Sequence, residues 1–205
     1  RQERLLPRTI DNYTLSRIFS AAYSDLRESQ SNNHYFVSTR NVAVLELLFA
    51  TGVRVSELCS ITCENLNLQN QVVLIKGKGS KERCIYISSP PVISALASYS
   101  ALRTAIDSPD PYFFLNRDKH RLSEQSVRRI ICRYTPTDAA HYTPHMFRHS
   151  FATYLWEQCG NIYEVKEILG HSSVKTTERY VHASFEQQKR ILTTMHPRNT
   201  LKIEF

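Results

Sequence analysis

The feature that most constrains the fold is a pair of short alternating runs, QVVLIK at 71–76 and ERCIYI at 82–87. Alternation of apolar and polar residues is the period of a β-strand with one buried face. The linking stretch GKGSK carries two glycines, which supply the backbone freedom of a tight turn. The two runs therefore predict one β-hairpin with a basic tip, in a chain whose other apolar residues repeat at helical spacing.

Outside the hairpin, apolar residues recur every three or four positions, which is the period of an amphipathic helix. The first such set is Leu15, Ile18, Phe19, Ala22 and Leu26. After a polar loop, a second helix is expected to begin at Ser38 or Thr39 and to end at Gly52, and a third to begin at Arg54. Further helices are predicted around 91–106, 123–134 and 143–160. The expected fold class is α+β, mainly α, with a small antiparallel β-sheet.

The charge balance favours an acidic partner. The 205 residues include 26 Lys and Arg against 19 Asp and Glu, a formal net charge of +7 at neutral pH, and a basic surface attracts nucleic acid. The five cysteines are odd in number and lack paired spacing, which is typical of reduced thiols rather than disulfides. No apolar run approaches the roughly 18 residues that a membrane helix needs, so no membrane partner is expected.

One predicted helix carries residues suited to phosphate near its start. In the stretch YTPHMFRH, Thr143 is a candidate N-cap and Pro144 lies in the first turn, so His145 and Arg148 share one face. A helix N-terminus attracts anions through its dipole and its unpaired N–H groups. For this pattern alone a solvated polar face is the commoner explanation. The spacing of His145 and His149 also matches a zinc pair, although no third ligand is suggested.

The later stretch LGHSSVKTTERYVHAS adds residues that meet the needs of phosphodiester exchange. That reaction needs a nucleophile, cations that hold the phosphate oxygens, and an acid for the leaving oxygen. A tyrosine hydroxyl, with a pKa of about 10, is a poor nucleophile at neutral pH unless cations and hydrogen-bond donors surround it. The candidates for these tasks are Tyr180 as nucleophile, Arg54 and Arg148 as phosphate clamps, Lys78 as acid, and His145 and His171 as hydrogen-bond donors or proton carriers.

Five motifs together resemble the catalytic domain of the tyrosine site-specific recombinases, the family of phage integrases and Xer-type proteins. They are TGVRVSEL, KGKGSKER, HMFRHSFAT, LGHSSVKTTERYVH and HPR, in the order and spacing usual in that family. The resemblance implies a tyrosine-recombinase catalytic fold in which Arg54 and Arg148 clamp the scissile phosphate. It implies that Lys78 protonates the leaving 5′ hydroxyl and that Tyr180 attacks. Taken alone, Tyr180 is one of eleven tyrosines, for which a structural role would be the simpler explanation.

The same resemblance implies supporting roles for three more residues: His145 assists proton transfer, His171 supports the phosphate, and Glu57 matches the acidic position that braces the first arginine. The implied reaction joins the tyrosine to a DNA 3′ phosphate, releases a 5′ hydroxyl, and is reversed by the hydroxyl of a second duplex. It requires no metal and no nucleotide cofactor. The implied partner is double-stranded DNA, on which four protomers assemble, with a monomer expected in solution and a bacterial or phage protein acting in the cytoplasm.

The expected domain organisation is a catalytic domain over 11–195, an interdomain linker remnant at 1–10 and a tail at 196–205. Family members usually carry an N-terminal helical domain that clamps the DNA together with the catalytic one, so this chain is either a fragment of a longer protein or one of the short DNA-invertase relatives that lack that domain. The fragment is favoured, because the chain opens without methionine in what resembles the family's linker. The C-terminal part offers an apolar helix face, made of Phe185, Ile191 and Leu192. This face docks either on a neighbouring protomer, as the family's tails do, or on the chain's own core.

The hairpin offers three candidate contacts to DNA phosphates, Lys76, Lys81 and Arg83, and for any one of them a plain surface charge is an equally good explanation. Lys78 is preferred to Lys76 and Lys81 as the proton donor because the family's lysine lies between two glycines. If the contacts are mostly to phosphate, binding by this part of the protein should be weak and strongly dependent on salt.

Three other functions stay open at this point. A basic, largely helical chain would suffice for a non-catalytic DNA-binding regulator, which has no need of Arg54, Arg148 and Tyr180 together. A type IB topoisomerase-like or hairpin-forming enzyme would share the chemistry but relax or cap DNA. A DNA invertase or a dimer-resolution enzyme would share both the chemistry and the exchange of strands with an integrase that inserts or excises a mobile element.

Overall fold

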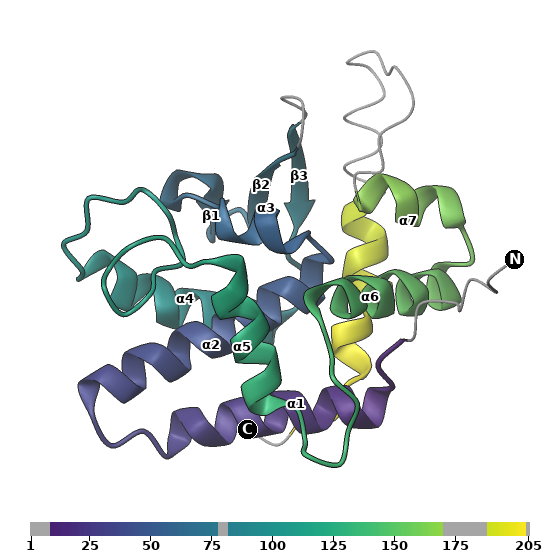
Figure 1. Ribbon diagram of the computed structural model, residues 1–205. Helices are drawn as coiled ribbons and strands as arrows, with labels where there is room; N and C mark the ends of the chain where they lie inside the picture. The colour runs from purple at the N-terminus through teal and green to yellow at the C-terminus, as the bar shows by residue number, and fades with distance from the viewer. Residues whose placement is uncertain (1–8, 78–81, 170–187, 204–205) are drawn as a thin grey trace, which may run out of the picture.

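The computed structural model describes residues 9–77, 82–169 and 188–203. Within these ranges the chain is mainly helical, with one three-stranded antiparallel sheet in the order β1-β2-β3 (Figure 1). The predicted fold class, mainly α with a small antiparallel sheet, is therefore confirmed. The elements are α1 (Asn12–Arg27), α2 (Asn32–Thr51), α3 (Val55–Cys59), η1 (Cys63–Asn65), β1 (Leu66–Asn67), β2 (Val72–Lys76), β3 (Glu82–Tyr86), α4 (Pro90–Thr104), α5 (Glu124–Tyr134), α6 (Pro144–Cys159), α7 (Ile162–Ile168) and η2 (Pro197–Thr200), together with a helix described over 188–195.

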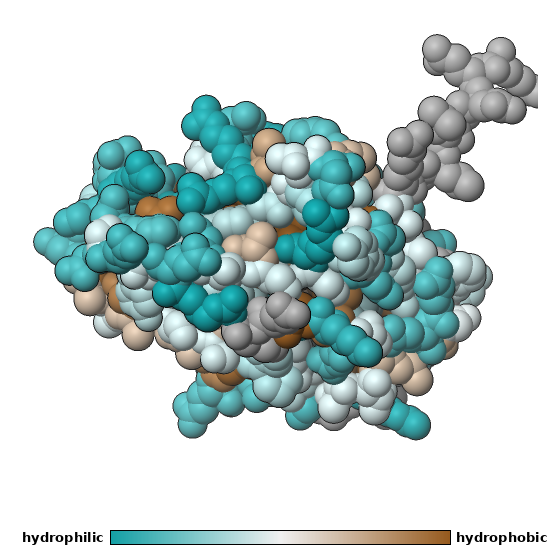
Figure 2. All heavy atoms as spheres, turned by 90° about the horizontal axis from the view of Figure 1, so that it is seen from below, coloured by the Kyte–Doolittle hydropathy of each residue, from teal (hydrophilic) through white to brown (hydrophobic). Residues whose placement is uncertain are grey.

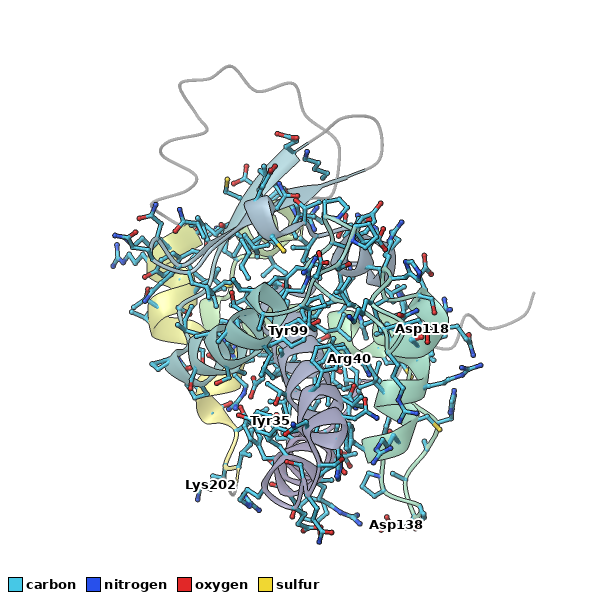
Figure 3. All side chains as sticks on the ribbon, turned by 90° about the vertical axis from the view of Figure 1, so that its left-hand side faces the viewer. Tyr35, Arg40, Tyr99, Asp118, Asp138 and Lys202 are labelled. Atoms are coloured by element: carbon cyan, nitrogen blue, oxygen red, sulfur yellow. The ribbon has the colours of Figure 1, made fainter. Side chains whose placement is uncertain are left out.

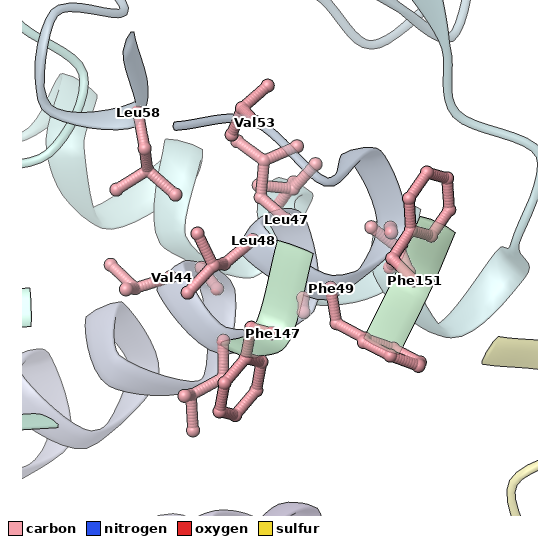
Figure 4. Packing of buried hydrophobic residues seen from close by; sticks show 14 of the residues in the cluster. Val44, Leu47, Leu48, Phe49, Val53, Leu58, Phe147 and Phe151 are labelled. Carbon is pink, nitrogen blue, oxygen red and sulfur yellow. The ribbon is translucent and has the colours of Figure 1, made fainter. Parts of the chain in front are cut away.

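Helix α2 is the centre of the fold, and Figure 1 shows it crossing the middle of the molecule. Every residue from Val37 to Thr51 is buried, because α1, α4 and α6 all pack against this helix. Figure 4 shows the packing between α2 and α6, where the rings of Phe49 and Phe147 meet edge to face with their centroids 6.4 Å apart. Because α2 is covered by neighbouring helices on several sides, it fixes their positions, and the polar side chains buried with it, such as Arg40 and Glu46, need partners inside the protein.

The predicted start of α2 at Ser38 or Thr39 is wrong. The helix begins at Asn32, where the side chain of Ser31 accepts a hydrogen bond from the backbone N–H of His34. Ser38 and Thr39 lie inside the helix, and their hydroxyls donate to backbone carbonyls three or four residues earlier. This local bonding satisfies a hydroxyl within a helix, so a Ser-Thr pair before an apolar run does not have to be a cap.

Other predicted boundaries agree with the structure. Gly52 and Gly160 end α2 and α6 in the left-handed conformation, with φ of 57° and 69°, and the side chain of Thr143 caps α6. The hairpin forms between β2 and β3 with Ile75 opposite Arg83. The short strand β1, which pairs with β2, and the short helix α7 were not predicted.

The long connection between α4 and α5 is held by two residues from the core, both labelled in Figure 3. The N–H of Leu115 donates to the hydroxyl of Tyr99 at 3.0 Å, and its carbonyl accepts from Nη1 of Arg40 at 3.1 Å. Arg40 also donates to the side chain of Asn41. Burial lowers the pKa of Arg40, and these bonds give the buried guanidinium neutral oxygen partners.

The described part of the C-terminal segment folds back on the chain's own core. Leu192 is completely buried, and Nε2 of His196 bonds to the carbonyl of Ala50 at 2.7 Å. The guanidinium of Arg198 donates to both carboxylate oxygens of Glu46, at 2.7 and 2.6 Å. Two of the three residues predicted to form an apolar face, Ile191 and Leu192, are therefore packed on their own chain, whereas Phe185 lies outside the described residues.

The face seen from below is mainly hydrophilic, with small separate apolar areas (Figure 2). All five cysteines lie within the described ranges and are free thiols. Among the helices that the structure describes, none is long and apolar enough to cross a bilayer.

Candidate functional site

The site begins where α2 ends. Gly52 adopts a φ of 57°, and a Cβ at this position would lie 2.5 Å from Cδ1 of Phe151 and 2.9 Å from Cδ2 of Leu169. Glycine is therefore required both by the left-handed backbone and by the close approach of α6 and the end of α7. The chain then turns through Val53 and starts α3 with Arg54 at the N-cap, as predicted.

Glu57 in the first turn of α3 is the centre of an ion cluster. Its side chain is only 5% exposed, whereas that of Arg54 is 47% exposed. Oε1 of Glu57 accepts from Nη1 of Arg54 at 2.9 Å, and Oε2 accepts from the backbone N–H of Arg54 at 2.8 Å. Glu57 thus caps the helix and holds the Arg54 side chain.

A second arginine binds the same carboxylate. Arg83 on β3 donates from Nη1 to Oε1 of Glu57 at 3.1 Å and from Nη2 to Oε2 at 2.8 Å. Burial by itself would raise the pKa of Glu57, but hydrogen bonds from Arg83 and from the backbone and side chain of Arg54 outweigh it and lower that pKa to about 2. Glu57 is therefore ionised at neutral pH.

Arg148, one turn into α6, is the third arginine of the cluster and is only 7% exposed. Nη1 donates to the carbonyl of Gly52 at 2.5 Å and Nη2 to the carbonyl of Leu169 at 2.9 Å, which fixes the plane of the guanidinium. Burial, followed by repulsion from Arg54, lowers the pKa of Arg148 to about 10, and Arg83 contributes further repulsion.

The cluster carries an excess of positive charge. Arg54, Arg83 and Arg148 stand against the single carboxylate of Glu57, so three positive charges minus one negative charge leave two. Arginine forks match the oxygens of a phosphate group, and partly buried cations bind an anion more strongly than cations in water do. The arrangement is suited to hold a phosphodiester and to stabilise charge that develops on it.

His145 lies in the first turn of α6, three residues before Arg148, and is exposed. The two residues lie one helical turn apart, but His145 is exposed to solvent whereas Arg148 is buried. Across the described ranges, no three His, Cys, Asp or Glu side chains gather as a metal ion would need, and this includes the pair His145 and His149.

The remaining predicted site residues fall in two groups. Lys78, Lys81, His171 and Tyr180 lie outside the described residues. Lys76 is described and exposed, with Nζ 4.0 Å from Oε1 of Glu82.

Arg83 was a candidate DNA contact, for which a plain surface charge was an equally good explanation. Its side chain is only 15% exposed, and its fork is committed to Glu57. The sequence did contain a signal for this, since strand alternation puts Arg83 in the same phase as buried Ile85. An arginine in the apolar phase of a strand needs a buried acceptor.

The sequence profile of the phage integrase family matches residues 22–187. The chain belongs to the phage integrase family. The resemblance to tyrosine recombinases drawn from the motifs is thereby confirmed.

Individual relatives agree with this assignment. This phage integrase family chain is 39% identical over 200 residues to a tyrosine recombinase of Agathobacter rectalis, covering 97% of the chain and 65% of that protein. It is 32% identical over 195 residues to tyrosine recombinase XerC of Actinobacillus pleuropneumoniae, covering 94% of the chain and 60% of that protein. The chain thus spans between 60% and 65% of the length of these two relatives.

Solved structures of recombinases share the fold. The crystal structure of XerA recombinase matches with a TM-score of 0.69 and 26% identity, over 95% of this chain and 63% of that one. The crystal structure of XerH site-specific recombinase in a post-cleavage complex with palindromic difH substrate matches with a TM-score of 0.67 and 25% identity, over 95% of this chain and 52% of that one.

Proposed function

We propose that this chain is the catalytic part of a site-specific DNA recombinase that cuts and rejoins DNA strands through a covalent 3′-phosphotyrosyl intermediate. The observation that carries the proposal is the cluster of Arg54, Arg83 and Arg148 around the single carboxylate of Glu57. Membership of the phage integrase family supports it, as does the description of XerH in a post-cleavage complex with its difH substrate.

Arg54 and Arg148 bind the non-bridging oxygens of the scissile phosphate. They hold it from two sides, because Arg54 begins α3 whereas Arg148 is fixed on α6 by the carbonyls of Gly52 and Leu169. Negative charge builds up on these oxygens as the phosphorus becomes five-coordinate, and fixed guanidinium groups stabilise that state without having to reorganise.

Tyr180 supplies the nucleophile. Its hydroxyl oxygen forms a bond to phosphorus as the bond to the 5′ oxygen breaks, which leaves a phosphotyrosyl ester at the 3′ end and a free 5′ hydroxyl. Lys78 donates the proton that the leaving 5′ oxygen takes up, while His145 receives the proton of the tyrosine hydroxyl and His171 hydrogen-bonds the phosphate.

The same groups catalyse the reverse step on a second duplex, whose 5′ hydroxyl attacks the phosphotyrosyl bond and releases Tyr180. One phosphate ester replaces another, so exchange is close to neutral in free energy. No step uses a metal ion or a nucleotide.

Double-stranded DNA is the proposed partner, with four protomers assembling on two duplexes and a monomer in solution. Lys76 and Lys81 on the hairpin are proposed DNA contacts. We further propose a catalytic domain over 11–195 between a linker remnant and a tail, an N-terminal DNA-binding domain in the whole protein, and action in the bacterial cytoplasm on chromosomal or mobile-element DNA. Support comes from bacterial relatives that are longer than this chain.

A suicide-substrate assay tests the proposal. The full-length protein and its Tyr180→Phe variant are incubated, without added metal and with a chelator, with nicked duplexes that carry the boundary sequences of the genetic element encoding the protein. The nick lets the short fragment that carries the new 5′ hydroxyl diffuse away. The reverse step is then prevented, so the covalent complex accumulates. A protein-linked DNA band on a denaturing gel is expected for the wild type and not for the variant.

Two outcomes would count against the proposal. A band that persists in Tyr180→Phe would exclude this tyrosine as the nucleophile. Specific binding of the duplex without any covalent band would favour a non-catalytic DNA-binding regulator. Transfer of strands between two differently labelled duplexes then separates a recombinase from an enzyme that only relaxes or caps DNA.

A further inference from the structure

Arg83 occupies an unusual position for a charged residue of a hairpin. It lies on β3 directly opposite the buried Ile75, so its side chain is on the same, inward face of the sheet and is nearly buried beside Glu57. Its Nε is also buried, without a hydrogen-bond partner among the residues that the structure describes. A buried, unpaired donor is unfavourable, so the fork that Arg83 makes with Glu57 has to compensate for it.

Arg54 and Arg83 use the carboxylate of Glu57 in different ways. Arg83 takes both oxygens with both of its terminal nitrogens, whereas Arg54 uses one terminal nitrogen on Oε1 and its backbone N–H on Oε2. The bidentate fork is the stronger and more directional of the two arrangements. Because Arg83 holds it, the half-exposed Arg54 stays in a one-point contact, open to an incoming anion.

We propose that Arg83 is a positioning residue, not a DNA contact: it occupies the bidentate site on Glu57 and thereby keeps the Arg54 guanidinium directed toward the scissile phosphate. This inference rests on the proposed function. Without Arg83, Arg54 is the remaining cation bonded to a buried carboxylate, and it moves onto both oxygens and away from the phosphate. Arg83 also ties β3, and with it the hairpin, to α3, so that both sides of the site move together.

The test compares binding with cleavage in the full-length protein. Affinity and its salt dependence are measured in a Tyr180→Phe background on the duplexes of the suicide assay, and the rate of covalent complex formation is measured at saturating DNA with Tyr180 present. Arg83→Gln is expected to slow covalent complex formation about 10- to 100-fold, as is typical for residues that orient metal-ligating side chains. Its affinity and salt slope are expected to match those of the parent.

Two further variants separate positioning from loss of structure. Arg83→Lys keeps the positive charge but can contact the Glu57 carboxylate at only one point. Its rate of covalent complex formation should therefore lie between those of Arg83→Gln and the wild type. In a Glu57→Gln background, Arg83→Gln should slow the reaction much less than in the wild type, because the interaction it serves is already gone. Arg17→Gln is the matched control: it removes an arginine fork on Asp138, between α1 and the connection after α5, and should leave the rate unchanged.

Several results would overturn the inference. If Arg83→Gln weakens binding and lowers the salt slope by about one while the saturated rate is unchanged, Arg83 is a phosphate contact. Equal effects of Arg83→Gln with and without Glu57 would also exclude the positioning role.

A crystal structure of Arg83→Gln provides an independent readout. Arg54 is expected to be bidentate on Glu57 in that variant, and an unmoved Arg54 overturns the inference even if the wild type forms no covalent complex. A wild type without a Tyr180-dependent band would instead count against the proposed function.

Discussion

Two buried glutamates in this protein each bind an arginine fork, and they differ in the balance of charge around them. Glu46 pairs with Arg198 between α2 and the C-terminal segment, with side chains 0% and 3% exposed. Glu57 is shared by Arg83 and the half-exposed Arg54, with Arg148 close enough to repel them. In the first cluster both side chains are buried and their charges cancel. The second has surplus positive charge, and its Arg54 side chain is about half exposed to solvent.

The difference shows how the same pair of residue types serves two purposes. The hydroxyl of Tyr23 completes the Glu46 pair at 2.8 Å and no second arginine is bonded to that carboxylate among the described residues. A sealed, balanced pair holds the chain together. A carboxylate with too many cations instead leaves part of their charge for an external anion, as expected of a phosphate-binding site.

The largest effect is expected at the closed pair. Glu46→Gln leaves the buried Arg198 without its counter-charge, and breaking a buried pair in this way costs about 3–5 kcal/mol of unfolding free energy. Urea denaturation measures the loss. Tyr23→Phe is the control, because it removes only one hydrogen bond to the carboxylate and should cost less, about 1.5–3 kcal/mol. If Glu46→Gln is as stable as Tyr23→Phe or more stable, the ion pair of Glu46 and Arg198 does not stabilise the fold as proposed.

At the open cluster the expected loss is in rate. Arg148→Lys keeps a positive charge, but a lysine cannot donate to both the Gly52 and Leu169 carbonyls and present a fork to phosphate. Covalent complex formation at saturating DNA should fall about 10²- to 10³-fold, the effect of removing one transition-state donor. Single-turnover kinetics measures this rate. A near-normal rate would mean that Arg148 supplies charge alone.

The smallest expected effect is a difference in the pH dependence of stability between His196, which neighbours the Glu46–Arg198 pair, and Glu57. Burial, together with repulsion from Arg198, lowers the pKa of His196 to about 4 from its usual 6.5, despite the bond to the Ala50 carbonyl. Between pH 6.5 and 4 the imidazole of His196 is protonated in the unfolded chain but neutral in the folded one. Its contribution to the free energy of unfolding is therefore complete above pH 6.5 and declines as pH falls toward 4. The slope is at most about 1.4 kcal/mol per pH unit.

Glu57 behaves differently over that range. Its pKa is about 2 against the usual 4.5, so its contribution is complete above pH 4.5 and declines only as pH falls from there toward 2. Unfolding free energies measured between pH 4.5 and 7 should therefore rise with pH through His196, and the His196→Gln variant should show a flatter profile. An unchanged profile in that variant would contradict a neutral, buried His196.

Local patterns predicted most of the elements. Apolar spacing placed α1, α4, α5 and α6, the left-handed glycines ended α2 and α6, and alternation placed β2 and β3, because these features depend on neighbours a few residues away in the chain. The start of α2 was wrong because Ser38 and Thr39 bond to their own helix as readily as they cap one.

The candidate site was predictable only in part. Motifs placed Arg54, Glu57 and Arg148 in one site, and the structure brings these three together. The commitment of Arg83 to Glu57 was not predicted, because it depends on a contact across 26 positions of sequence between a strand and a helix.

By itself, the sequence determined the helical character of the chain, the single hairpin and the family, since periodicity and motifs are properties of short stretches. Only the tertiary structure decided which charges are balanced. Glu46 and Arg198 are 152 positions apart, and Glu57 meets Arg83 because the hairpin of β2 and β3 lies against α3. Whether a charge is buried, paired or left over depends on long-range packing, which removes water from some side chains and leaves others exposed.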